Sequence, residues 1–310
     1  MSAASVHGEV QETSHGSSLS ATWLTNSDGE STFVIRGASL CAETVGTVVI
    51  IPPFGLSTSD LFIPSYVLQS NGFDVVRFDA RNSVGRSSGE ILDYTLGSLR
   101  RDAEQVLEWI PAPAGPLILV SLSLSSPVAW KVAARNTAVS AVAAIVGVVD
   151  VPSTLLSAAG LDVGDYRATD AHEITRPVFG HEVKAHKFVT DMDAEGLDSF
   201  AGTRSAVLET KAAGLLLASE DDEYVAVETV SMLQMSDEER LKLRVMAGGS
   251  HELGRSPRAF QQAMREVARF CLQIAGVSSD PVTPRVAESI SASGAESAFL
   301  AQISKEKRTR

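Results

Sequence analysis

Three alternating serines, Ser121, Ser123 and Ser125, lie where an apolar run ends and a helical pattern begins. A strand, a sharp turn and a helix form the nucleophile elbow of serine hydrolases. Its usual pattern is G-x-S-x-G, because the flanking positions have room only for small residues. Only Ser123 has small residues both two positions before it and two positions after it. Ser121 has a leucine two positions before it, and Ser125 has a proline two positions after it. Ser123 is therefore the candidate nucleophile; the alternative is a buried strand that ends in a serine N-cap.

Two later segments offer the acid and the base that an activated serine needs. In α/β-hydrolase sheets the acid and then the histidine follow the serine along the chain, each in the loop after a later strand. An acidic cluster over 220–223 follows one predicted strand, and His251 follows the next. We favour Asp222 over Asp221 as the acid, because Asp222 stands three residues before the apolar residue at which the next helix is expected to start. The alternatives are a solvated helix N-terminus for the cluster and a backbone-capping role for His251.

Together these residue types point to acyl transfer through a covalent serine ester. His251 would take the proton of Ser123, while Asp222 would fix the tautomer of the imidazole and stabilise its charged form. The negative charge that develops on the substrate oxygen needs two backbone N–H donors, which form an oxyanion hole. We expect one from Leu124, next to the nucleophile, and one from Phe54, the first residue with an N–H after two prolines.

The elements that must position these residues are predicted from hydrophobic periodicity. Continuous apolar runs over 47–51, 73–79 and 141–149 alternate with amphipathic helical patterns, and the turn Asn26–Gly29 predicts a hairpin. Alternating strands and helices indicate βαβ units and a mostly parallel sheet. The sequence thus predicts an α/β-hydrolase fold, with a mostly parallel central sheet, helices on both of its faces and a small inserted cap.

The domain organisation follows from where this alternation holds and where it fails. The first residues are polar and serine-rich, which is typical of a loose arm. The alternation stops after the strand that ends near residue 149 and resumes near residue 212. We expect a flexible N-terminal arm over 1–18, an α/β-hydrolase core over 19–150 and 212–275, a cap insertion over 151–211 and a C-terminal tail over 276–310.

The composition limits the class of protein. The 310 residues carry 26 Lys and Arg against 38 Asp and Glu, a net charge of −12 that argues against a nucleic-acid partner. Two cysteines are too few for a disulfide framework or a zinc cluster, and the spacing of His181 and His186 suits no metal site, so we expect neither metal nor cofactor. Without an apolar run that could span a bilayer or a signal-peptide pattern, we expect a cytoplasmic protein without a membrane partner.

The motifs around the candidate catalytic residues resemble those of a known family. The run 121–125, the acidic cluster before Tyr224 and the segment 249–254 are similar to the lux-type acyl transferase family of bacterial bioluminescence, α/β-hydrolases that include myristoyl-carrier-protein thioesterases. The resemblance covers roughly residues 20–275. The family has Ala-x-Ser-x-Ser around its nucleophile, so Ser121 replaces the usual alanine, and the N-terminal arm and the tail are unlike the family's.

This resemblance implies a catalytic triad of Ser123, Asp222 and His251, and an acyl thioester substrate carried on the phosphopantetheine arm of an acyl carrier protein. The acyl group would be a fatty-acyl or a polyketide-type chain, and a downstream acceptor could replace water. The alternatives are a carboxylesterase-type serine hydrolase acting on small oxygen esters, and a hydrolase-fold binder that has lost catalysis.

An acidic carrier protein would be repelled by an enzyme with a net charge of −12. Docking of such a partner therefore requires a local basic patch. The sequence-based candidates for this patch are Arg77, Arg81, Arg86, Arg100 and Arg101.

Overall fold

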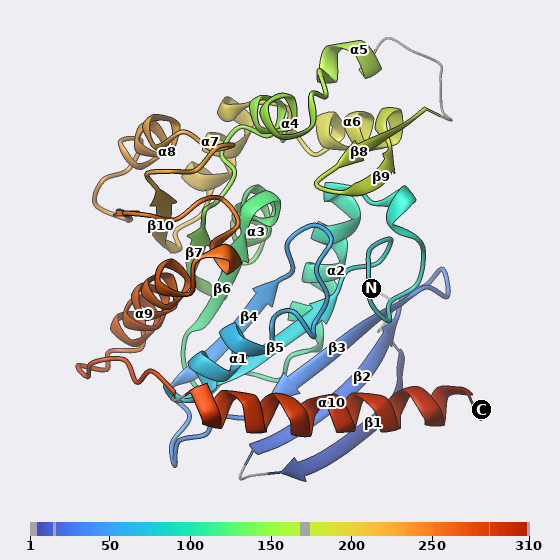
Figure 1. The fold of residues 1–310 in the computed structure, drawn as a ribbon, viewed down its shortest axis with the longest axis vertical. Helices are drawn as coiled ribbons and strands as arrows, with labels where there is room; N and C mark the ends of the chain where they lie inside the picture. The colour runs from blue at the N-terminus through green and yellow to red at the C-terminus, as the bar shows by residue number, and fades with distance from the viewer. Residues whose placement is uncertain (1–4, 15–16, 168–173, 285, 309–310) are drawn as a thin grey trace.

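A computed structural model describes residues 5–14, 17–167, 174–284 and 286–308 of the chain. Parts of the predicted arm (1–4, 15–16), cap (168–173) and tail (285, 309–310) lie outside the described residues. The elements form a central sheet flanked by helices, with further helices and a small hairpin above one edge of the sheet (Figure 1).

The central sheet has nine strands in the order β1-β2-β3-β5-β4-β6-β7-β10-β11. Every pairing from β5 to β11 is parallel, whereas β1, β2 and β3 join the sheet by antiparallel pairings. This confirms the predicted mostly parallel sheet and the predicted hairpin, which is the β2–β3 pair. The strands are β1 (Ser5–Ser14), β2 (Ser17–Thr25), β3 (Ser31–Gly37), β4 (Gly46–Ile51), β5 (Phe73–Asp79), β6 (Leu117–Leu122), β7 (Val139–Ile145), β10 (Ala213–Ser219) and β11 (Leu241–Met246).

Helices cover both faces of this sheet, as predicted, because the parallel strands are apolar on both sides. On one face α1 (Phe62–Gln69) and α9 (Pro257–Ile274) pack their buried side chains against the strands. On the other face lie α2 (Leu96–Trp109), α3 (Ser126–Arg135) and α8 (Val227–Gln234).

The starts of these helices are encoded locally. Thr95 and Ser98 form a capping box at the start of α2, and Ser256 caps α9 by accepting a hydrogen bond from the N–H of Ala259. Pro257 occupies the first helical position of α9, where its missing N–H costs nothing.

The segment between β7 and β10 lies over the carboxyl edge of the parallel strands (Figure 1). Its side chains Phe188, Val189 and Met192 are fully buried, so these helices share one hydrophobic core with the sheet face below. The strands β8 and β9 form a separate two-stranded hairpin. The elements of this segment are α4 (Val151–Ala159), α5 (Val163–Arg167), β8 (Thr175–Val178), β9 (His181–Lys184), α6 (Ala185–Ala194) and α7 (Phe200–Glu209).

The N-terminal residues form regular structure that the sequence did not suggest. The prediction of a loose arm is wrong for residues 5–14, which form β1 and pair with β2. At the other end, α10 (Val286–Arg308) packs Phe299, Leu300 and Ile303 against apolar residues of β2 and β3. A serine-rich strand has little apolar signal of its own, so its pairing partner decides its structure.

Two arginines proposed for a basic patch are instead buried. Arg77 on β5 is 1% exposed and pairs with Glu296 of α10, while Arg81 is 6% exposed and pairs with Asp102 of α2. The prediction that they form a docking patch is therefore wrong. A third, Arg100, forms ion pairs with Glu104 and Glu195.

The buried ion pair between Arg81 and Asp102 yields a test of what holds this region. Asp102 is fully buried and also accepts a hydrogen bond from the Arg81 N–H at 2.7 Å, and burial raises the pKa of its carboxyl to about 6. We expect Asp102→Ala to lower the free energy of unfolding by about 3–5 kcal/mol, because it leaves the Arg81 guanidinium buried beside one fewer anion. Chemical denaturation of the purified protein measures this change.

The matched control is Glu30→Ala, which removes the other, half-exposed partner of Arg81. An exposed ion pair contributes at most about 1 kcal/mol, so this variant should stay close to the wild type. Equal losses for the two variants would show that the buried carboxylate has no special role.

Candidate active site

Ser123 lies at the sharp turn between β6 and α3. The 3₁₀ turn Ser123–Ser125 joins the two elements, and the backbone φ of Ser123 is 52°, in the left-handed region that non-glycine residues rarely adopt. The Val148 N–H donates a hydrogen bond to the Ser123 carbonyl at 3.1 Å, which holds this conformation from the loop after β7. The chain therefore makes the strained strand–turn–helix junction that the sequence predicts, with Ser123 at its tip.

The serines that replace the usual glycines are part of the junction. Ser121 and Ser125 are fully buried, and both hydroxyls have partners. Ser121 Oγ donates to Ser126 Oγ at 3.2 Å, and Ser125 Oγ lies 3.2 Å from the carbonyl oxygen of Ile51. Since Ile51 ends β4, Ser125 connects the turn to the segment that leads to Phe54.

The structure brings Ser123, His251 and Asp222 together, although they follow three different strands. Ser123 Oγ lies 2.6 Å from His251 Nε2, and His251 Nδ1 lies 2.9 Å from Asp222 Oδ2. The side chains of His251 and Asp222 are 6% and 2% exposed, so their hydrogen bond is shielded from water. Such a line of hydroxyl, imidazole and carboxylate can remove the proton of the serine.

The loop after β10 decides between the two candidate acids. Asp222 Oδ1 accepts hydrogen bonds from the N–H groups of Tyr224 and Val225, both at 2.9 Å, which orients the carboxylate toward the imidazole. Asp221 is exposed. The geometry therefore favours Asp222, as the sequence did.

Sequence reasoning missed three residues that surround the imidazole. The carboxylate of Glu223 accepts the backbone N–H of His251 at 3.0 Å, which fixes the histidine loop. Phe179 stacks on the His251 ring with centroids 6.2 Å apart, and the Tyr224 ring meets it edge-on at 5.2 Å. The only local signals were the position of Glu223 beside Asp222 and the dipeptide Phe179-Gly180.

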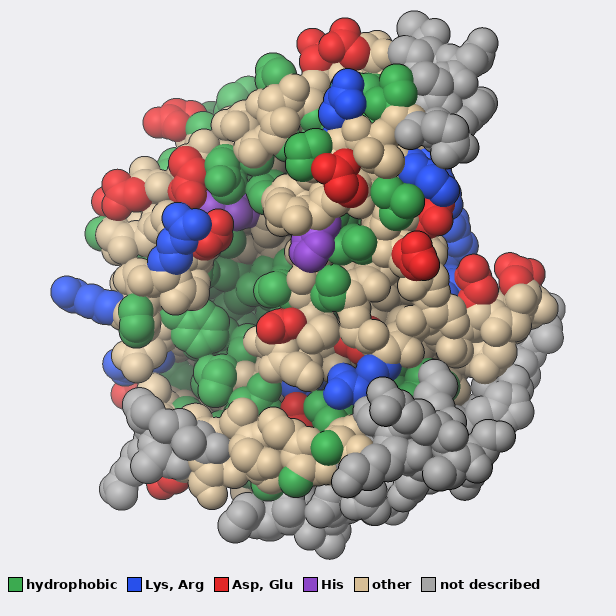
Figure 2. All heavy atoms as spheres, turned by 45° about the vertical axis from the view of Figure 1, so that its right-hand side comes forward, with side chains coloured by type: hydrophobic (Ala, Val, Ile, Leu, Met, Phe, Trp, Pro, Cys, Tyr) green, Lys and Arg blue, Asp and Glu red, His purple; other side chains and the backbone are tan. Residues whose placement is uncertain are grey.

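Phe179 reaches the imidazole because it forms the tip of the β8–β9 hairpin. Phe179 and Gly180 have φ values of 46° and 83°, and two successive positive φ values are typical of the tight turns that close two-residue hairpins. The hairpin of the inserted segment thus lies directly over His251. Figure 2 shows a hollow on this side of the molecule, lined by hydrophobic side chains and with histidine side chains near its edge.

The predicted oxyanion donors lie on segments that meet at the turn. Leu124 follows Ser123 directly, and Phe54 follows β4, which pairs with β6 so that Ile51 is opposite Ser121. The Phe54 ring packs against Tyr94 at 4.8 Å and against His181 at 5.7 Å. The role of the two N–H groups stays a prediction.

Two alternate residues of β5, Arg77 and Asp79, hold the segment after β4 in place through hydrogen bonds to Thr58. The Asp79 carboxylate accepts the N–H of Thr58 at 2.6 Å, and Arg77 donates to the Thr58 carbonyl at 2.5 Å. Asp79 also accepts the N–H of Arg86 at 2.7 Å, and its burial raises the pKa of its carboxyl. These bonds fix the loop that carries Phe54 relative to the sheet.

Gly55 allows the inserted segment to approach this loop. Its φ is 75°, and a Cβ atom at this position would lie 2.7 Å from the ring of His181. A side chain here would have to displace the hairpin, so glycine is required by both the backbone conformation and the close contact.

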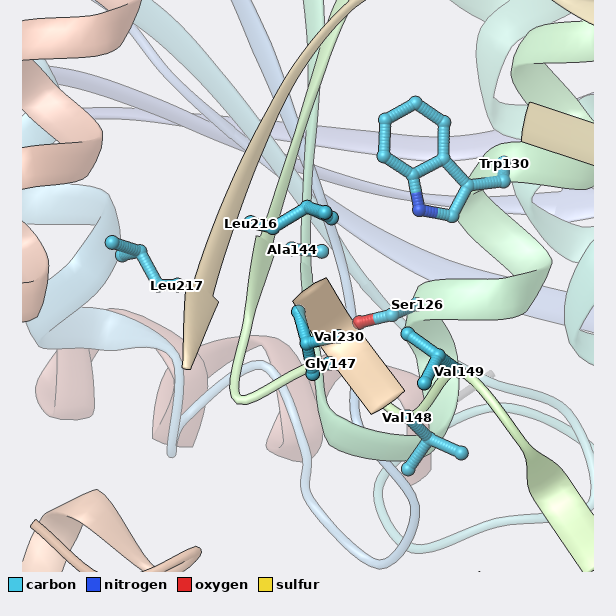
Figure 3. Close-up of a pocket in the computed structure, with 9 residues that line it drawn as sticks. All are labelled: Ser126, Trp130, Ala144, Gly147, Val148, Val149, Leu216, Leu217 and Val230. Carbon is cyan, nitrogen blue, oxygen red and sulfur yellow. The ribbon is translucent and has the colours of Figure 1, made fainter. Parts of the chain in front are cut away.

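An apolar crevice lies beside the turn but offers no room for a ligand. It is enclosed by the start of α3, the loop after β7, β10 and α8 (Figure 3). It has no space for a water molecule, and the hydroxyl of Ser126, which lines it, bonds Ser121. Trp130, Leu216 and Val230 line it and belong to the hydrophobic core.

Other kinds of site find no support in the described part of the chain. No group of three or more His, Cys, Asp or Glu side chains there could hold a metal ion. None of the helices in the same part combines the length and the apolar character that crossing a bilayer requires.

The amino-acid sequence is similar to those of known acyl transferases. A family model described as acyl transferase matches residues 41–296. An acyl transferase of Photobacterium leiognathi is 29% identical over 229 residues, covering 72% of this chain and 71% of its own. One of Photobacterium phosphoreum is 26% identical over 254 residues, covering 79% and 82%.

Solved structures of other proteins share the fold of this chain. Est1E from Butyrivibrio proteoclasticus superposes with a TM-score of 0.65 at 15% identity, covering 83% of this chain and 99% of its own. The thioesterase domain from the curacin biosynthetic pathway gives a TM-score of 0.55 at 15% identity, covering 86% and 100%. At this identity the likeness extends to the fold alone, and it confirms the predicted α/β-hydrolase fold.

The contact between Asp222 and the imidazole can be tested with a reagent that labels activated serines. We expect Asp222→Asn to slow fluorophosphonate labelling of Ser123 by about 10³–10⁴-fold, because an amide no longer holds His251 in the tautomer that accepts the serine proton. Peptide mapping by mass spectrometry gives both the labelled residue and the rate.

The neighbouring substitution Asp221→Asn removes the same charge from an exposed position and should leave the labelling rate unchanged. If Asp221→Asn slows labelling and Asp222→Asn does not, the acid has been assigned to the wrong residue.

Proposed function

Because the chain belongs to the acyl transferase family, we propose that it cleaves an acyl thioester from an acyl carrier protein through an acyl-Ser123 intermediate. The family and the esterase and thioesterase neighbours support acyl-ester hydrolysis or transfer. The single observation that carries the proposal is the line of hydrogen bonds from Ser123 through His251 to Asp222.

The first half of the reaction forms the acyl-enzyme. Ser123 Oγ attacks the thioester carbonyl carbon while His251 Nε2 takes the hydroxyl proton, and Asp222 stabilises the resulting imidazolium. The carbonyl oxygen becomes negative, and the N–H groups of Leu124 and Phe54 donate hydrogen bonds to it. The C–S bond then breaks, and His251 gives its proton to the departing sulfur, so the carrier leaves as a free thiol.

The second half releases the acyl group. Water, or the hydroxyl or other nucleophile of an acceptor, loses a proton to His251 Nε2 as it attacks the ester carbonyl. The proton returns to Ser123 Oγ when the C–O bond breaks. Hydrolysis yields a free acid, and transfer yields the acylated acceptor, so the identity of the attacking molecule decides between thioesterase and transferase.

The strained backbone at Ser123 suits this use. A φ of 52° costs free energy that a merely structural serine would not need, and such strain is concentrated at functional sites. Hydrogen bonds of Ser121, Ser125 and Val148 offset this cost by stabilising the turn. The Ser123 hydroxyl is therefore directed at the imidazole before substrate binds.

The acyl-enzyme itself is the expected product of a direct experiment. Incubation with carrier-protein thioesters of graded acyl length should add the mass of the acyl group to the intact enzyme, and the length that gives the most adduct identifies the preferred chain. We expect Ser123→Ala to form no adduct and to lower kcat by about 10⁴-fold or more. Full turnover by Ser123→Ala would end the proposal.

The exposed thiol of Cys41 requires a control, because thiols exchange with thioesters without enzymatic help. The measurement is therefore made in a Cys41→Ser background, which leaves buried Cys271 as the other cysteine. An oxygen ester of the same acyl group, assayed in parallel, tests the carboxylesterase alternative. A higher kcat/KM for the oxygen ester would favour that alternative.

A further inference from the structure

The charge of this acidic protein is distributed unevenly. The chain has a net charge of −12, yet the segment 241–274 contains six Arg and Lys residues against two Glu residues. This segment comprises β11, the loop that carries His251 and α9. The excess of positive charge is therefore attached to one side of the candidate active site.

On α9 three arginines share one face. Arg258, Arg265 and Arg269 are spaced by seven and four residues, so they align along one face of the helix. Arg265 and Arg269 lie about 10 Å and about 16 Å along the helix axis from Arg258. They border a shallow surface groove, and Arg258 and Arg265 are exposed. The remaining residues along the groove are Gln261, Gln262 and Glu266.

The row continues onto the edge of the sheet and toward the histidine loop. Glu266 pairs with Arg269 and lies 3.9 Å from Arg244 of β11, the edge strand. Arg255, four residues after His251, is exposed and pairs with Glu252. The basic strip is defined here as Arg244, Arg255, Arg258, Arg265 and Arg269.

The central members of the basic strip have no counter-ion of their own. Within the part of the chain that the structure describes, neither Arg258 nor Arg265 forms an ion pair, whereas Arg77, Arg81 and Arg100 do. Charged side chains on an edge strand such as β11 can serve to prevent pairing with other chains. That explanation covers Arg244 but not a row of arginines on the solvent face of a helix.

The basic strip also begins at the active site. Because β11 is parallel to its neighbours, its carboxyl end and the start of α9 lie at the same edge of the sheet as Ser123 and Asp222. Arg255 and Arg258 therefore lie near His251, and the rest of the strip leads away from it along the outer face of α9.

We propose that the basic strip is the docking surface for the acyl carrier protein whose thioester the active site cleaves; this rests on the proposed function. Most of the surface would repel an acidic carrier, so the strip fixes both where the carrier binds and how it is oriented. Docking there places the phosphopantetheine arm at the edge that holds Ser123. The phosphate of that arm suits the planar guanidinium groups of Arg255 and Arg258.

The test compares one acyl group on two carriers. Steady-state kinetics are measured with the acyl carrier protein thioester and with the same acyl group on free pantetheine, for the wild type and for Arg258→Glu combined with Arg265→Glu. We expect the variant to raise KM for the carrier-protein substrate about tenfold or more with little change in kcat, and to leave the pantetheine substrate unaffected. Added salt should raise the wild-type KM for the carrier-protein substrate more than that of the variant.

The control is Lys211→Glu, which reverses an exposed charge at the amino end of β10, on the sheet edge opposite the active site. It should leave both substrates unaffected. If the double variant leaves KM for the carrier-protein substrate unchanged, or if the control raises it equally, the basic strip is not the docking surface.

Failure of the proposed function would look different, because it would be visible in the wild type. A wild-type enzyme that turns over acyl pantetheine but not the carrier-protein thioester lacks the proposed substrate, and that result overturns the role of the strip as well. A wild-type enzyme that turns over the carrier-protein thioester keeps the proposed function whatever the variants show.

Discussion

The hydrogen bond between Ser123 Oγ and His251 Nε2 joins residues that are 128 positions apart, and much of the architecture holds its two ends in place. One end is fixed by a strained turn whose buried serines bond β4 and α3. The other end is fixed by the carboxylates of Asp222 and Glu223, which bind the imidazole and the backbone N–H of the same histidine. A bond of this length survives only if neither loop moves by more than a fraction of an ångström.

The parallel sheet makes this convergence possible. Strands β4, β6, β10 and β11 all run in one direction, so the loops after them meet at one edge even though their sequences are far apart. The same geometry sends α9 back along the outside of the sheet, which places its arginines next to the edge that carries the chemistry. Site and proposed docking surface are thus two consequences of one strand direction.

Arginine has two distinct uses in this acidic protein. Arg77 and Arg81 are buried and bind backbone carbonyls or carboxylates, so they stabilise loops around the sheet. Arg258 and Arg265 are exposed, and this leaves their charge available to a partner. The inserted segment contributes in another way, because Phe179 covers the imidazole with an aromatic ring and shields the hydrogen bonds below it from water.

The alternation of strands and helices, the single serine that fits a tight turn, and the positions of acid and histidine could all be predicted from the amino-acid sequence. These features depend on neighbouring residues, such as the small flanks of Ser123. Three features could be seen only in the folded chain: which arginines are exposed, that residues 5–14 form a strand, and that Phe179 and Glu223 contact His251. Each of these features depends on which distant segment packs against a residue, and local hydrophobic periodicity does not identify that segment.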